Sequence, residues 1–314
     1  MKSIRPTSRS RISMRHPKAV LFLLALATAA GLQNAVAADS SPASVSAVPV
    51  VAVSILPQSE FVARIGGGKV KVLTLVGPGA SPHSYEPTPR QMAELSGASI
   101  WLSIGVEFEN ALLPKVKSLY PKLKVVNTVK DVVYRKLESH AHEEGAAADE
   151  AGGLDPHVWL GREAVITQLA ATRDALIALK PSEAAIFNAN HDAYLREINS
   201  VFSLLAKELA PLKGGTTFVY HPSFGYFLDN FGIKQEAVEV GGKEPTQKTL
   251  SLLIKNARED GARIIFVQKQ FSPTAAKTVA KAIGGIVVEI DPLAPNWLEN
   301  IKSMGDALKK TVAR

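Results

Sequence analysis

The chain has 314 residues, with 36 Lys and Arg against 29 Asp and Glu, and no cysteine. Disulfide bonds are therefore excluded, and the length allows apolar cores large enough for two domains. Six basic residues and no acidic residue lie in the first 37 positions, so the rest of the chain is nearly neutral, unlike a nucleic-acid-binding protein.

The first 37 residues are expected to be a secretory signal peptide, with a membrane anchor as the alternative. Basic residues precede the apolar run 19–27, and residues 35–37 (Ala-Val-Ala) fit a cleavage site ending at Ala37. The apolar run is too short to remain as a membrane-spanning helix. We therefore expect a soluble product that is exported to the periplasm. Residues 38–49 consist mainly of Ala, Ser, Pro and Val, and this composition predicts a disordered lead-in.

From residue 50 onward, short apolar segments alternate with helical patterns. Four segments lie in the first half (50–55, 70–76, 100–104 and 123–126) and four in the second half (217–220, 237–240, 264–267 and 286–290). Strands that alternate with helices in this way are typical of α/β lobes with mainly parallel sheets. We expect an N-terminal α/β lobe over residues 50–181 and a C-terminal α/β lobe over residues 211–314.

Residues 182–210 are predicted to form one long, rigid helix that joins the two lobes. The segment has no internal Gly or Pro, and one face is apolar at helical spacing: Tyr194, Ile198, Val201, Leu205 and Leu209. At about 1.5 Å per residue, the helix would be roughly 40 Å long. A connector of this kind limits how far two lobes can open and close.

Three histidines lie beside prolines at or beyond predicted strand ends. His83 and His157 belong to the first lobe, whereas His221 and Asp291 belong to the second. Ligands bind at the carboxyl ends of strands in open α/β sheets, so these residues are expected to meet between the lobes. Three imidazoles and one carboxylate suit tetrahedral Zn²⁺. Taken alone, each histidine is more typically a surface or hydrogen-bonded residue in a turn, and Asp291 a capping residue. The even division of the four residues between the two lobes is what favours a metal site.

Six segments, in order along the chain, resemble the metal-binding proteins of ABC importers. They are GASPHSYEPTPRQM (79–92), DPHVWL (155–160), YHPSFGYFLDNFG (220–232), VGGKEPTQKTL (240–250), FVQKQFSP (266–273) and EIDPL (289–293). This is the cluster A-I family, with ZnuA- and TroA-like members. The resemblance implies two lobes joined by a single helix, with the metal bound by His83, His157, His221 and Asp291. Histidine rather than glutamate at the third position favours Zn²⁺, with Mn²⁺ or iron as the alternative.

The resemblance also implies a function. We expect a periplasmic solute-binding protein, a monomer that captures Zn²⁺ and delivers it to an inner-membrane ABC permease, with a metallochaperone as a further partner and no nucleic acid. The alternatives are a secreted zinc hydrolase and a surface adhesin or metal sink. Four protein ligands would leave no position for a catalytic water, and the chain has no HExxH motif, so a hydrolase is disfavoured.

Several further residues are candidates for supporting roles. Zinc-type members of the family often carry a long His- and acid-rich loop, of which this chain has only a short form with His140 and His142. This loop is interpreted either as an auxiliary metal-collecting segment or as a solvated loop. Glu86 and Asp155 are candidate hydrogen-bond partners of the ligating histidines, or else turn residues. Gln268 stands where many relatives carry Glu.

Overall fold

The computed structural model describes residues 48–137, 153–239, 246–262, 264–271 and 274–312. The predicted signal peptide, nearly all of the predicted lead-in, and both His140 and His142 lie outside these residues. Within the described part of the chain, no helix is both long enough and apolar enough to cross a membrane.

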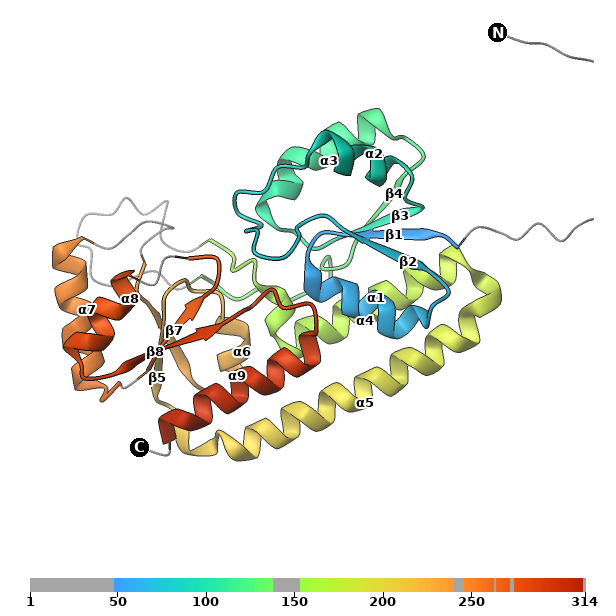
Figure 1. The fold of residues 1–314 in the computed structure, drawn as a ribbon. Coiled ribbons are helices and arrows are strands. Elements are labelled where there is room, and N and C mark those ends of the chain that lie inside the picture. Colours follow the sequence, from blue (N-terminus) through green and yellow to red (C-terminus); the bar gives the residue numbers. More distant parts are fainter. Residues whose placement is uncertain (1–47, 138–152, 240–245, 263, 272–273, 313–314) are drawn as a thin grey trace, which may run out of the picture. The chain divides into compact units, whose positions relative to one another are not determined.

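The first lobe contains a four-stranded parallel sheet in the order β2-β1-β3-β4 (Figure 1). Its strands are β1 (Val50–Val53), β2 (Lys71–Thr74), β3 (Ile100–Ser103) and β4 (Lys124–Asn127). The connecting helices are α1 (Leu56–Gly66), α2 (Pro89–Ser96) and α3 (Glu107–Leu119). The central strands are almost wholly buried and the edge strands are partly exposed, as expected for a parallel sheet between helices.

The second lobe repeats this arrangement in the order β6-β5-β7-β8, again with all strands parallel. Its strands are β5 (Thr216–Val219), β6 (Lys234–Ala237), β7 (Ile264–Gln268) and β8 (Ile286–Ile290). Its helices are α6 (Gly225–Asp229), α7 (Gln247–Glu259), α8 (Thr274–Ala282) and α9 (Trp297–Val312). The predicted α/β class with two mainly parallel sheets is confirmed.

One predicted strand lies three residues away from its observed position. The apolar segment 237–240 was expected to be the strand, but β6 begins at Lys234 and ends at Ala237. Because β6 is an edge strand, only alternate residues are buried, namely Gln235 and Ala237. The four residues of β6 (Lys-Gln-Glu-Ala) include only one apolar residue, Ala237, so a search for hydrophobic runs does not reveal this strand.

Two long helices follow the first sheet: α4 (Arg162–Leu179) and α5 (Ala184–Glu208). The α5 helix contacts α1 and α4 of the first lobe as well as α9 of the second lobe. Its buried side chains recur every three or four residues: Phe187, His191, Tyr194, Ile198, Phe202 and Leu205. The observed helix lies within the predicted span 182–210. Its rigidity, and the domain boundaries that it would set, stay predictions.

The two lobes are packed together within one compact unit that spans residues 47–314. Trp159 of the first lobe donates a hydrogen bond from its indole Nε1 to the carbonyl of Pro292 at 2.8 Å. Trp297 of the second lobe donates in the opposite direction, to the carbonyl of Trp159 at 2.6 Å. The buried Trp297 ring also packs edge-to-face against Phe61 of α1, at a centroid distance of 5.3 Å. These contacts hold together the loops that carry the candidate metal ligands.

A buried carboxylate organises the turn between β3 and α3. Glu109 is 1% exposed and accepts hydrogen bonds from the backbone N–H of Ile104 (2.9 Å) and Gly105 (2.7 Å), and from the Ser54 hydroxyl. Gly105 has a φ of 85°, a conformation that favours glycine. Burial raises the pKa of Glu109, although these hydrogen bonds act in the opposite direction. The clamped turn leads directly into Glu107 at the start of α3.

Replacing Glu109 is expected to destabilise the first lobe. Glu109→Ala removes the acceptor of the Ile104 N–H, the Gly105 N–H and the Ser54 hydroxyl, at about 1–3 kcal/mol for each group that stays buried and unpaired. Glu109→Gln retains one acceptor oxygen and should lose much less. Urea unfolding of metal-free protein, followed by circular dichroism, measures both values. Glu94→Ala is the control, because Glu94 pairs only with exposed Arg90 on α2. Equal unfolding free energies for Glu109→Ala and the control would contradict the role of Glu109.

Candidate metal centre

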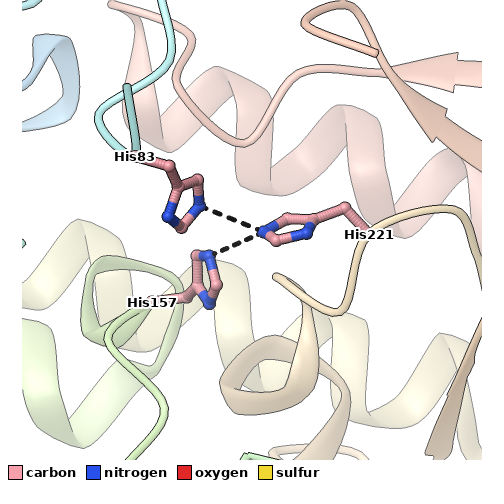
Figure 2. A group of neighbouring side chains, drawn as sticks. All are labelled: His83, His157 and His221. Carbon is pink, nitrogen blue, oxygen red and sulfur yellow. Dashed lines mark hydrogen bonds between the residues drawn. The ribbon is translucent and has the colours of Figure 1, made fainter. Parts of the chain in front are cut away.

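Three histidine rings from distant parts of the chain point toward one another (Figure 2). His83 lies between β2 and α2, His157 immediately precedes the short 3₁₀ helix Val158–Leu160, and His221 follows β5. The Nε2 atom of His221 lies 3.2 Å from Nε2 of His83 and 3.2 Å from Nε2 of His157. The three offered ligand atoms all lie within 4.8 Å of one another. Among the described residues, this is the one group of side chains with metal-ligand geometry.

A carboxylate lies beside the other ring nitrogen of each histidine. The Nδ1 atoms of His83, His157 and His221 lie 3.1, 2.7 and 2.6 Å from oxygens of Glu107, Asp155 and Glu239, respectively. A carboxylate in this position accepts a hydrogen bond from Nδ1–H. The proton stays on Nδ1, and the Nε2 lone pair is free. The three lone pairs therefore converge on one region. A divalent cation bound in this region would be attracted to all three lone pairs.

The nitrogen spacing fits a single tetrahedral ion. With Zn–N distances of about 2.0–2.1 Å, neighbouring ligand nitrogens in a tetrahedron lie about 3.3–3.4 Å apart. Both Nε2 separations measured from His221 are 3.2 Å. The rings also meet edge-on, with interplanar angles of 75° and 77° to His221, so each ring presents its nitrogen and not its face. Two of the three nitrogen separations thus match those around one tetrahedral Zn²⁺, and the ligand atoms of His83 and His157 lie within 4.8 Å of each other.

The three histidines differ in their access to solvent. The side chain of His157 is 3% exposed, that of His221 is 12% exposed and that of His83 is 32% exposed. Burial lowers the pKa of His157, even though Asp155 acts in the opposite direction, and this keeps the imidazole neutral and ready to bind a cation. An ion would therefore enter from the side of His83.

Hydrogen bonds keep two of these carboxylates, Asp155 and Glu107, ionised. Burial alone would raise the pKa of Asp155, but its hydrogen bonds from the His157 ring and backbone outweigh burial, and the hydrogen bond from Arg135 adds to them, so the pKa is lowered. The pKa of Glu107 is lowered for a similar reason, through His83. Ionised carboxylates increase the basicity of the imidazoles and add negative charge around the ion.

The backbone at His221 is held by the amide of Gln268. This side chain is 1% exposed, and its Oε1 accepts a hydrogen bond from the His221 N–H at 3.2 Å. Its Nε2 donates to the His221 carbonyl at 2.5 Å and to the Ser223 hydroxyl at 2.9 Å. A glutamate could not donate to that carbonyl unless it were protonated. Gln268 thus acts on the position of a ligand without touching the ion.

Asp291 lies outside the group formed by the three histidines. Its Oδ1 accepts hydrogen bonds from Gln270 Nε2 at 3.0 Å and from the backbone N–H of Leu293 at 2.9 Å. The next residues, Pro292 and Leu293, line the same pocket as the histidines. The structure therefore brings three of the four predicted ligands together, and ligation by Asp291 stays a prediction.

The carboxylates around the histidines were only partly anticipated. Asp155 contacts His157, whereas Glu86 is exposed and the carboxylate beside His83 is Glu107. Glu107 and Glu239 were not considered from the sequence. Glu107 follows the carboxyl end of β3, so the rule that selected the histidines could also have selected it. Glu239 follows β6, but it lay inside the segment 237–240 that was expected to be the strand.

The chain is similar to known metal-binding proteins over most of its length. Residues 51–311 match the family model described as the periplasmic zinc-uptake complex component A, ZnuA. The zinc-binding lipoprotein AdcA of Streptococcus pneumoniae is 27% identical over 260 residues, which is 81% of this chain and 52% of AdcA. The chain thus spans about half the length of this curated relative.

Solved structures share the fold. The crystal structure of ZnuA superimposes with a TM-score of 0.77 and 31% identity, covering 84% of this chain and 99% of that chain. FpvC of Pseudomonas aeruginosa in complex with Mn²⁺ has a TM-score of 0.72 and 20% identity, covering 85% of this chain and 99% of that chain. At this lower identity, the similarity to FpvC concerns the fold alone.

Neutralising the buried carboxylates is expected to weaken Zn²⁺ binding. Asp155→Asn and Glu239→Gln should each lower the affinity by about 10–100-fold, because they remove the charged acceptor of a ligand Nδ1–H. Glu107→Gln should lower the affinity for Zn²⁺ less, since the Glu107 side chain is 49% exposed and water can replace its carboxylate. Competition with a chromophoric chelator measures the dissociation constants. Glu86→Gln is the control, and a loss as large as that of Glu107→Gln would contradict the role given to Glu107.

Proposed function

The chain belongs to the ZnuA family of periplasmic zinc-uptake components, and we propose that it captures Zn²⁺ between its lobes and delivers it to an ABC permease. The observation that carries this proposal is the convergence of three Nε2 atoms, each backed by a carboxylate at Nδ1. Because both lobes supply ligands, binding of the ion stabilises their contact. A permease that separates the lobes would thereby release the ion.

Zinc is the cargo that the donor atoms favour. Three imidazole nitrogens suit Zn²⁺, whereas Mn²⁺ prefers more carboxylate oxygen ligands. The carboxylates of this site contact imidazole Nδ1 atoms, where they support the histidines. Mn²⁺ remains the alternative cargo. Competitive titration with Zn²⁺ and Mn²⁺, together with elemental analysis of protein purified from its native compartment, distinguishes the two.

We propose Asp291 as the fourth ligand. Its backbone neighbours line the pocket, and its carboxylate is held by Gln270, another residue of that pocket. A carboxylate oxygen of Asp291 would complete a tetrahedron of protein ligands around the ion. A closed set of four ligands has no position for a catalytic water, which supports transport and not hydrolysis.

The remaining expectations concern location and partners. The basic and apolar N-terminal segment supports export to the periplasm with cleavage near Ala37. We propose that the exported protein acts as a monomer, receives zinc directly or from a metallochaperone, and docks on the membrane-embedded permease of its importer.

Substitution of the histidines tests the binding site. His83→Ala, His157→Ala and His221→Ala should each weaken Zn²⁺ binding by at least about 100-fold, because each removes one of few ligands. Isothermal titration of purified protein should show one tightly bound Zn²⁺ per wild-type chain. His191→Gln is the matched control, since His191 lies on α5, outside the group. Retention of wild-type affinity by two of the three variants would refute the site.

A cellular experiment tests import. A strain that lacks this gene should grow poorly under zinc chelation, and the wild-type gene, but not His157→Ala, should restore growth. Normal growth of the deletion strain, with no physical interaction with a permease, would instead favour a metal sink or an adhesin.

The His140 and His142 segment is tested separately. We propose that it collects zinc weakly, so the double variant His140→Ala/His142→Ala should lose a second, weaker equivalent of Zn²⁺ and keep the first. Unchanged stoichiometry and affinities would show that the segment has no role in equilibrium binding.

A further inference from the structure

Arg135 connects the carboxylate behind His157 to the second lobe. Its segment pairs with the segment that leads to His157, through an antiparallel bridge between Lys136 and Leu154 and a hydrogen bond from the Asp155 N–H to the Arg135 carbonyl at 3.0 Å. The Arg135 Nη1 donates to Asp155 Oδ2 at 2.9 Å, while its Nε donates to Asp229 Oδ2 of α6 at 2.8 Å. The Arg135 guanidinium thus donates hydrogen bonds to one carboxylate in each lobe.

The first residues of α6 are shaped around this guanidinium. A Cβ atom at Gly225 would lie 1.7 Å from Arg135 Nη1, so only glycine at this position leaves room for the arginine where it now lies. The Tyr226 hydroxyl accepts a hydrogen bond from the Arg135 N–H at 3.0 Å and donates one to the Asp155 carbonyl at 3.0 Å. The backbone on both sides of the Arg135–Asp155 pair is therefore also held by α6.

Arg135 helps to orient the Asp155 carboxylate. The Asp155 side chain is fully buried, with one oxygen at His157 Nδ1 and the other at Arg135 Nη1. A buried carboxylate that loses one partner keeps an uncompensated charge and gains freedom to rotate. The planar guanidinium offers several N–H groups in one plane and can serve Asp155 and Asp229 together, whereas a lysine ammonium cannot reproduce this geometry.

We infer that Arg135 is a positioning residue that makes the metal affinity of His157 depend on contact between the lobes. It acts through Asp155 and does not touch the ion. When α6 is in place, Asp229 and Gly225 hold the guanidinium against Asp155, and Asp155 in turn holds the His157 ring with Nε2 toward the site. When α6 moves away, Arg135 loses its hydrogen bond to Asp229. Asp155 is then held less firmly, and the orientation of the His157 ring is less fixed. This inference rests on the proposed function, since it assumes that the site binds Zn²⁺.

The test measures Zn²⁺ dissociation constants for variants of the mature protein, with the melting temperature of each metal-free form. Arg135→Gln should weaken binding about 10-fold, at the lower end of the range for residues that support a ligand. Arg135→Lys should recover only part of that loss. Gly225→Ala, which alters none of the hydrogen-bonding side chains, should displace the guanidinium and weaken binding in the same direction. Asp229→Asn should cause a smaller loss, because this side chain is 54% exposed.

Double variants separate positioning from general destabilisation. If Arg135 acts through His157, Arg135→Gln should change affinity less than about twofold in the His157→Ala background. Asp229→Asn and Gly225→Ala should likewise lose their effects in the Arg135→Gln background. The d–d absorption of bound Co²⁺ should change with Arg135→Gln, because the imidazole is less well oriented. Arg173→Gln is the control and should change neither readout, because Arg173 lies on α4 and pairs with its exposed neighbour Asp174.

The outcomes distinguish this inference from the proposed function. If the wild-type protein binds no Zn²⁺, the proposed function fails. If the wild-type protein binds Zn²⁺ and Arg135→Gln binds it equally well, with an unchanged Co²⁺ spectrum, the role of Arg135 is refuted. A fully additive effect of Arg135→Gln in the His157→Ala background also refutes it, because the arginine would then act by another route.

Discussion

The structure depends on holding three imidazole lone pairs at one point. Each ring of His83, His157 and His221 is fixed by a carboxylate at Nδ1, so its Nε2 has no proton of its own to donate. The Nε2 atom of His221 lies 3.2 Å from both other Nε2 atoms, so the three rings converge on one region. A divalent cation held there would be coordinated by all three imidazoles.

The surrounding fold supplies the rigidity that this arrangement requires. Two parallel sheets bring their carboxyl ends, and thus their loops, to the same region. The hydrogen bonds of Trp159 and Trp297 hold the lobes together next to the site. Gln268 fixes the backbone of His221, and Glu109 fixes the turn that leads to Glu107. Each ligand thus has a second element that limits its movement, which reduces the ordering needed when an ion binds.

The residues that orient His157 also take part in the contact between the lobes. Arg135 is hydrogen-bonded to Asp155 of the first lobe and Asp229 of the second, and Gly225 leaves the space that it occupies. A protein that must hold an ion tightly and later release it benefits from such linkage. Its affinity can then change with a modest displacement of α6, without any change in the ligands themselves.

The sequence by itself determined the α/β class, seven strand positions, the three histidines and their division between two lobes, because these follow from local hydrophobic pattern and strand-end position. Only the tertiary structure decided which side chains meet. Glu107 and Glu239 contact the Nδ1 atoms of His83 and His221, respectively. Gln270 is hydrogen-bonded to Asp291, and Arg135 is hydrogen-bonded to residues of both lobes. Such pairs join residues from separate strands and loops, and no local pattern encodes which side chains will meet. Strand β6 was predicted three residues too late because its own four residues contain only one apolar side chain and give no hydrophobic run.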